Sequence, residues 1–248
     1  MEITWVITKK DIHKVKAILD QNDNAFVRNR HKRNVKKVGV AIDRNTVIKA
    51  MIMCLLTSQQ RSGPESRVGR FLRLNSFPLT YDIISRESDL QSYTQQVLID
   101  HDLKRYINRI AAFFTQNIRK IQDSDWSLVT ELKSLNETDS QIKERRFADK
   151  LAESFKGMGP KQARNFLQHI GITKYEIPID SRITNWLNKF GFPVTLSSSP
   201  LSDKGYYHFV SDGIQKLCEK SDTYPCLLDA AIFSSFDNDE WNENNLII

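Results

Sequence analysis

Apolar residues recur every three or four positions along most of this 248-residue chain, which is the spacing of one buried face of an α-helix. Only 9 glycines and 7 prolines are present, too few to interrupt such helices often, and no internal repeat or low-complexity tract is evident. The helices that this pattern predicts span residues 12–26, 46–59, 64–74, 103–121, 126–135, 140–155, 160–170, 183–190, 203–220 and 224–236. Residues 238–248 lack the pattern and are expected to be loosely held. The sequence therefore predicts an all-α protein.

Two of the predicted helices meet at a pair of glycines, Gly157 and Gly159. Glycine permits the positive φ and the close backbone approach that a tight hairpin needs, and Pro160 fits the first turn of the second helix without losing a hydrogen bond. The free N–H groups at the start of that helix point outward and favour a phosphate. The segment is therefore predicted to be a helix, a hairpin and a helix that binds a phosphate.

Lys161 follows this hairpin directly and is predicted to lie in the first turn of the second helix. A lysine is a nucleophile only when its amine is deprotonated, and the positive end of the helix dipole disfavours the ammonium form. Burial in a closed cleft would lower the pKa further. Lys161 is therefore a candidate nucleophile.

Asp180 comes nineteen residues after Lys161 and directly before a helical apolar pattern that ends at Gly191. This position predicts an N-cap whose carboxylate is kept ionised by backbone N–H groups. A ten-residue helix from Lys161 carries the chain roughly 15 Å away, and residues 171–179 span up to about 30 Å, so the chain is long enough to bring Asp180 back to Lys161. An ordinary capping aspartate is the alternative interpretation.

The pattern Gly157-Met158-Gly159-Pro160-Lys161 with Asp180 resembles the helix-hairpin-helix DNA glycosylases, and most closely their iron-sulfur-free 8-oxoguanine branch. The resemblance implies that the lysine attacks the sugar C1′ of a flipped-out nucleotide, that the Schiff base formed then undergoes β-elimination, and that the aspartate assists. It also implies a two-lobed all-α fold with the active-site cleft between the lobes, and a monovalent cation bound at the hairpin. In polymerases, ligases and junction proteins, by contrast, such a hairpin lysine only contacts phosphate.

A second, weaker resemblance to the same family covers residues 54–60, which end the predicted apolar helix. It implies that Gln59 fills the hole left by the flipped base, whereas the alternative is an exposed residue at a helix end. With Gly157, Gly159, Pro160 and Arg182, Gln59 is expected to contact DNA.

Most of the residues expected to form the base pocket lie near the end of the chain. Asp229 and Phe233 are four residues apart and therefore share a helical face. A carboxylate accepts hydrogen bonds from guanine N1–H and N2–H, and an aromatic ring stacks on a base. Trp241 and Gln21 are further pocket candidates. The alternative is a surface aspartate beside a core phenylalanine.

The resemblance also implies how the chain divides. Residues 41–171 are expected to form a barrel-like helical lobe that ends in the helix-hairpin-helix, and residues 1–40 with 172–248 to form a second lobe from both chain ends. The net charge of +6 and the pI near 9.1 suit a partner such as double-stranded DNA. The basic run at residues 28–37 would grip a DNA backbone, signal nuclear import or form a solvated loop.

Three cysteines are too few for a four-thiolate iron-sulfur cluster, and the five histidines show no paired metal-ligand spacing. We therefore expect no iron-sulfur cluster and no catalytic metal. No signal peptide and no membrane-spanning apolar run is evident, so an intracellular monomer is expected, in the cytoplasm or nucleoid or, in a eukaryote, in the nucleus.

Together these features predict a base-excision-repair DNA glycosylase with AP lyase activity that removes 8-oxoguanine from double-stranded DNA. Two alternatives stay open at this point: a glycosylase for an oxidised pyrimidine or an alkylated purine, and a non-catalytic helix-hairpin-helix protein that binds DNA. Asp180 separates enzyme from binding module, because a module has no need of a carboxylate beside the hairpin lysine.

Overall fold

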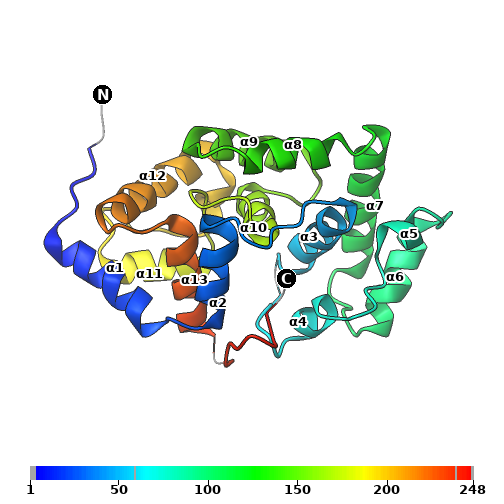
Figure 1. Ribbon diagram of the computed structural model, residues 1–248, viewed down its shortest axis with the longest axis horizontal. Helices are drawn as coiled ribbons and strands as arrows, with labels where there is room; N and C mark the ends of the chain where they lie inside the picture. The colour runs from blue at the N-terminus through cyan, green and yellow to red at the C-terminus, as the bar shows by residue number, and fades with distance from the viewer. Residues whose placement is uncertain (1–3, 59, 238, 247–248) are drawn as a thin grey trace.

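The structure, a computed structural model, describes residues 4–58, 60–237 and 239–246, and these residues form helices and no β-strand. The predicted all-α class is therefore confirmed (Figure 1). None of the described helices is long and apolar enough to cross a membrane. The helices are α1 (Lys9–Gln21), α2 (Ala25–Arg30), η1 (His31–Val35), α3 (Arg44–Leu56), α4 (Arg67–Leu72), α5 (Tyr81–Ile84), α6 (Leu90–Asp100), α7 (Ile107–Asp123), α8 (Ser127–Asn136), α9 (Gln141–Ser154), α10 (Pro160–Ile170), α11 (Ser181–Phe190), η2 (Ser199–Ser202), α12 (Lys204–Lys220) and α13 (Pro225–Phe236).

The largest hydrophobic core among the described residues surrounds α3. Every residue of this helix from Val47 to Leu56 except Lys49 is buried, so the helix has no polar face, as is typical of a helix enclosed by others. It packs against α7 and α10, and the core that these helices share extends from Val47 to Ile172 in the chain. The helices that follow one another between those two residues therefore build one compact lobe.

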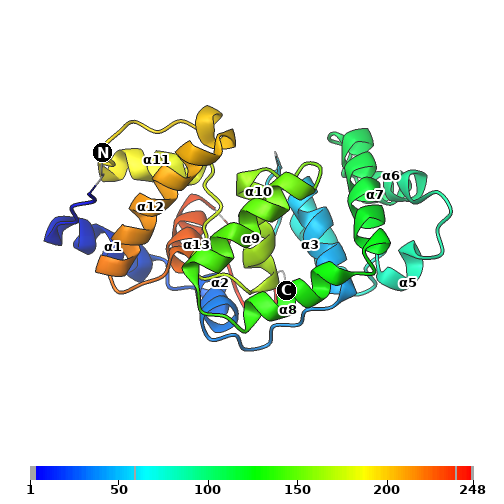
Figure 2. The same cartoon turned by 90° about the horizontal axis from the view of Figure 1, so that it is seen from above.

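The second core combines the two ends of the chain. Val15 of α1 packs there with residues 177–232, which include Ile183, Tyr207 and Ile214. Figure 1 shows α1 beside α12 and α13, and the turned view in Figure 2 shows α9 and α10 between this group and α3. Helices α9 and α10, which the hairpin joins, are therefore the part of the first lobe that lies next to the second core.

Some helix boundaries differ from those predicted. The first helix ends at Gln21, and a new one begins at Ala25 because the Asn24 side chain caps it, accepting from the N–H groups of Phe26 and Val27. Helices α5 and α6 were not predicted at all. Of the four buried residues of α6, Thr94 is polar and only Leu90, Val97 and Leu98 are apolar, so the apolar pattern is too sparse to recognise in the sequence.

The basic run at residues 28–37 has a structural role that none of the three interpretations anticipated. Asn34 donates to the carbonyl oxygens of Gln168 and Thr173, at 3.1 and 2.8 Å. Arg33 donates to Ile170 O at 3.2 Å, and Lys37 to Ile172 O at 2.7 Å. Cations and donors at this place satisfy the free carbonyl groups that end a helix, here α10. The run therefore fastens α10 to the N-terminal segment.

The expectation of a loosely held tail is wrong for residues 239–246. Trp241 is only 7% exposed, and its ring stacks on Phe26 at 4.4 Å between centroids. Arg61 pairs with Asp239 at 2.7 Å, and Arg73 donates to Asn245 O at 3.2 Å. The tail thus runs from the end of α13 to the lobe around α3 (Figure 1).

Candidate active site

The hairpin between α9 and α10 has the geometry that its glycines predict. Gly157 has φ +75, and a Cβ there would lie 2.7 Å from a methyl group of Leu55 and 2.9 Å from the ring of Phe113. Only glycine meets both constraints without strain. Asn117 of α7 holds the turn, because its side chain accepts from Lys156 N at 2.8 Å and donates to Lys156 O at 2.9 Å. The start of α10 is therefore rigidly placed.

Gly159 is the N-cap of α10, and Pro160 is its first residue. No side chain caps the free N–H groups there, and a Cβ on Gly159 would meet nothing within 4 Å. The amides at this helix start are thus open to an approaching anion. Phosphate binding at Gly157, Gly159 and Pro160 stays a prediction.

Lys161 lies in the first turn of α10 and lines a cleft of about 710 Å³. Its amine makes no hydrogen bond or ion pair with any residue that the structure describes. Burial lowers the pKa of Lys161, and the nearby guanidinium of Arg182 lowers it further, whereas Asp180, Cys54 and Asp229 act in the opposite direction. The amine is therefore easier to deprotonate than that of an ordinary lysine.

Asp180 caps α11, as the sequence predicts. Its carboxylate accepts from the N–H groups of Arg182 and Ile183 at 2.9 and 3.3 Å, and from the Arg182 Nε at 3.0 Å. Burial raises the pKa of Asp180, but the Arg182 guanidinium, these hydrogen bonds and the Lys161 charge lower it by more. The carboxylate is ionised at neutral pH and lines the same cleft as Lys161.

Arg182 is engaged within the cleft. Besides its contacts with Asp180, its guanidinium lies 4.2 Å from the ring centre of Phe233. In this arrangement the side chain holds Asp180 and covers Phe233, and its contact with DNA stays a prediction.

Asp229, Phe233 and Trp241 all line the cleft. Asp229 is only 9% exposed, which rules out the alternative of a surface aspartate. Burial raises the pKa of Asp229 to about 6, although Arg30, whose Nη1 lies 4.0 Å from the carboxylate, opposes the shift. Phe233 is 5.4 Å from Phe26 and 5.8 Å from Trp241, measured between ring centroids. The cleft therefore combines an acceptor with aromatic surfaces.

Two other predicted residues are not part of this arrangement. Gln21 is exposed at the end of α1 and does not line the cleft, so it is not a pocket residue. Gln59 lies outside the described residues. Its neighbours Ser58 and Gln60 both line the cleft.

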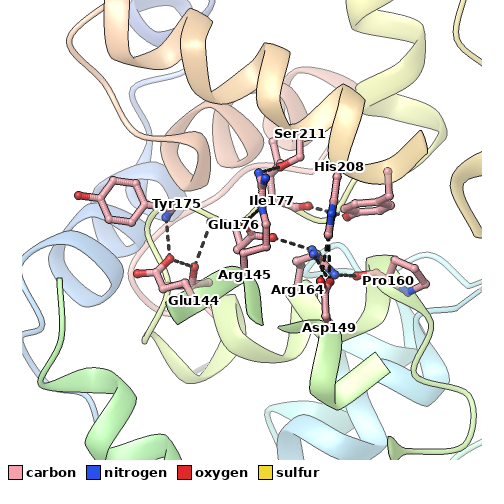
Figure 3. A network of polar contacts seen from close by, with 12 residues as sticks. Glu144, Arg145, Asp149, Pro160, Arg164, Tyr175, Glu176, Ile177, His208 and Ser211 are labelled. Atoms are coloured by element: carbon pink, nitrogen blue, oxygen red, sulfur yellow. Dashed lines mark hydrogen bonds and ion pairs between the residues drawn. The ribbon is translucent and has the colours of Figure 1, made fainter. Parts of the chain in front are cut away.

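A polar network behind the cleft was missed by the sequence analysis (Figure 3). Arg164 of α10 is fully buried and pairs with Glu176 at 2.7 Å and with Asp149 at 2.8 Å. Arg145 of α9 pairs with Glu176 at 3.2 Å, and the His208 ring contacts Asp149. Nothing local in the sequence marks these charges as partners, because they come from three different helices and a loop.

No group of three or more His, Cys, Asp or Glu side chains suited to a metal ion occurs among the described residues. Cys54, Cys218 and Cys226 are free and buried. A monovalent cation at the hairpin would need backbone carbonyl oxygens, of which Lys156 O is already used by Asn117. The cation, like the absence of other cofactors, stays a prediction.

No family model matches the chain, and no curated protein matches it by sequence. Several solved structures are similar in fold, among them two 8-oxoguanine DNA glycosylases. One is the 8-oxoguanine DNA glycosylase of Thermotoga maritima, with 16% identity and a TM-score of 0.62 over 92% of this chain and 96% of that one. The other is the 8-oxoguanine DNA glycosylase of Methanocaldococcus jannaschii, with 14% identity and a TM-score of 0.65 over 94% of this chain and 98% of that one. The chain therefore has the fold of these glycosylases along nearly its whole length, and the predicted fold is confirmed.

Proposed function

We propose that this protein is a base-excision-repair DNA glycosylase with AP lyase activity, and that it removes 8-oxoguanine from double-stranded DNA. The observation that carries the proposal is that the amine of Lys161, unpaired among the described residues, lines one cleft with the ionised carboxylate of Asp180. The two solved glycosylases of the same fold support the reaction class.

In the proposed reaction the flipped nucleotide occupies the cleft with its C1′ facing Lys161. The amine lone pair forms a bond to C1′ as the bond between C1′ and the base breaks, and the departing base takes up a proton. Asp180 stabilises the positive charge that develops on the sugar. The attached nitrogen gives up a proton, the bond between C1′ and the ring oxygen then breaks, and the oxygen takes up a proton and remains on C4′ as a hydroxyl, which gives the Schiff base. Removal of a proton from C2′ expels the 3′ phosphate and cuts the strand.

Recognition of the lesion is assigned to Asp229 and Phe233. With a pKa of about 6, the Asp229 carboxylate is mostly ionised at neutral pH and accepts from guanine N1–H and N2–H. The ring of Phe233 offers a stacking face. Both contacts suit a guanine-type lesion better than an oxidised pyrimidine, which lacks this pair of donors.

Borohydride trapping tests the nucleophile. Borohydride reduces the Schiff base, so the wild-type protein should become covalently joined to a duplex that contains 8-oxoguanine. Lys161→Gln should lose the adduct and still bind DNA. Lys156→Gln is the matched control, because Lys156 is an exposed lysine of the same hairpin, and it should form the adduct normally.

The outcomes separate the alternatives. An adduct with Lys161→Gln would show that another amine is the nucleophile. Binding of duplex DNA with no adduct on any of the 8-oxoguanine, thymine-glycol and alkylated-purine substrates would favour a non-catalytic DNA-binding protein. Trapping on thymine glycol or an alkylated purine in preference to 8-oxoguanine would support Lys161 as the nucleophile but show that the substrate is a different lesion.

A further inference from the structure

Two buried residues connect the helix that carries Lys161 with the loop that leads to Asp180. Arg164 lies one turn after Pro160 and donates to its carbonyl oxygen at 3.3 Å. Its Nε lies 2.7 Å from the carboxylate of Glu176, four residues before Asp180 in the chain (Figure 3). Both side chains are fully buried, so solvent does not weaken the pair. The start of α10 and the loop are therefore fastened to each other.

Tyr207 of α12 holds the last part of that loop. Its hydroxyl donates to Ile177 O at 2.6 Å and accepts from Ile179 N at 2.8 Å, one residue before Asp180. Burial raises the pKa of Tyr207, so the hydroxyl stays protonated and able to donate. The Arg164 guanidinium lies 4.6 Å from the centre of the same ring. The loop has no regular secondary structure, so the hydroxyl supplies Ile177 O and Ile179 N with the partners that a neighbouring strand would otherwise supply.

We propose that Tyr207, together with Arg164 and Glu176, is a positioning residue that sets the alignment of the Asp180 carboxylate with the Lys161 amine. None of the three lines the cleft, so none of them touches substrate. This inference rests on the proposed function of Lys161 and Asp180.

The pKa of the Lys161 amine depends on where the Asp180 carboxylate lies, so it measures the alignment of the two groups. The charged or titratable groups that act on its amine are Asp180 and Arg182 of the α11 start, Cys54 of α3 and Asp229 of α13. Of the groups that favour the ammonium form, Asp180 has the largest effect and is the one that follows the loop held by Tyr207. If the loop loses its hydrogen bonds to Tyr207, the Asp180 carboxylate is held less firmly beside Lys161 and stabilises the ammonium form less. The pKa of Lys161 then falls.

The test compares Tyr207→Phe with a control from the same helix. Phenylalanine keeps the buried ring but removes both hydrogen bonds. The control is Ile214→Val, which removes a methylene group from the same core and leaves the loop contacts in place. The pKa of Lys161 is measured without DNA by NMR titration of lysine labelled with carbon-13 at Cε, with Lys161→Gln to assign the signal. Single-turnover excision of 8-oxoguanine is measured alongside it.

Tyr207→Phe should lower the pKa of Lys161 by about 0.5 to 1 unit, a part of the shift that a nearby opposite charge produces. It should slow excision by roughly 10- to 100-fold, the scale for a small misplacement of reacting groups. Ile214→Val should change neither quantity. A folded Tyr207→Phe with the wild-type pKa and rate would overturn the positioning role while leaving the proposed function intact. An inactive wild type would overturn the function, and the titration would still decide the alignment.

A milder variant covers the case in which Tyr207→Phe does not fold. Arg145→Gln removes the outer partner of Glu176, together with the contacts of Arg145 to Asp212 and Ser211 of α12, from a side chain that is 19% exposed. It should shift the pKa of Lys161 and the excision rate in the same directions by smaller amounts. No change in either quantity would overturn the proposal.

Discussion

Gly157 and Gly159 are separated by one residue and should respond to alanine in opposite ways. At Gly157 the backbone has φ +75, and an added Cβ would lie 2.7 Å from Leu55 Cδ2 and 2.9 Å from Phe113 Cδ2. The left-handed backbone costs an L-residue about 1–2 kcal/mol, and forcing extra volume into a packed site costs about 1–3 kcal/mol. Gly157→Ala should therefore lower the free energy of unfolding by about 3 kcal/mol, which lowers Tm by about 6–12 °C in a protein of this size.

At Gly159 the backbone has φ −67, which alanine adopts without strain, and its Cβ would meet no other atom of the described chain within 4 Å. Gly159→Ala should stay within about 1 kcal/mol of wild-type stability. Its methyl group would project beside the free N–H groups where we expect a phosphate. If the methyl group keeps the phosphate from one of these N–H groups, a hydrogen bond to a charged group is lost, and duplex binding should weaken by about 10-fold.

Thermal unfolding and a fluorescence-anisotropy binding assay at fixed ionic strength measure both effects. Gly157→Ala should change mainly the unfolding temperature, and Gly159→Ala mainly the affinity for DNA. Equal loss of stability in the two variants would refute the steric reasoning. Wild-type affinity in Gly159→Ala would refute the phosphate site.

The remaining predictions concern the carboxylates of the cleft. Asp180→Asn should slow excision by at least ~100-fold, as expected for loss of a positioned charge, and cost no more than about 1 kcal/mol of stability, because asparagine also caps helices; near-normal single-turnover rates would reduce Asp180 to a capping residue. The folded state raises the pKa of Asp229 from 3.8 to about 6, so wild type should lose stability relative to Asp229→Asn as the pH rises from about 4 to above 6, by up to about 3 kcal/mol. Urea unfolding of both proteins across this range measures the difference, and a gap that does not change with pH would contradict the burial of an ionisable carboxylate. Excision of 8-oxoguanine should decline below pH 6 as Asp229 becomes protonated. Asp229→Ala should weaken the binding of duplex that contains 8-oxoguanine by ~1 to 3 kcal/mol and leave the binding of undamaged duplex unchanged.

The parts of the site that the sequence revealed are those fixed by local chemistry. A hairpin with two glycines and a proline, and an aspartate before a helical apolar pattern, specify backbone geometry within a few residues, and the structure has both features where they were expected. The role of Arg33 and Asn34 was hidden because their partners are carbonyl oxygens more than 130 residues away in the chain. Arg164 was hidden for a different reason: a buried cation looks like a surface one until its counter-charges are placed beside it.

The tail that joins the two lobes also affects how salt dependence should be interpreted. Arg61 is 57% exposed, and its pairs with Asp237 and Asp239 fasten the tail segment that carries Trp241. Added salt screens an exposed ion pair of this kind in the same concentration range in which it weakens phosphate contacts. The slope of log affinity against log salt concentration would therefore contain two effects: the weakening of the ion pairs that Arg61 makes with Asp237 and Asp239, and the release of counterions from DNA. If DNA binding needs the tail segment in place, the slope exceeds the number of phosphates bound, and the slope for Arg61→Gln, which lacks these ion pairs, should be smaller.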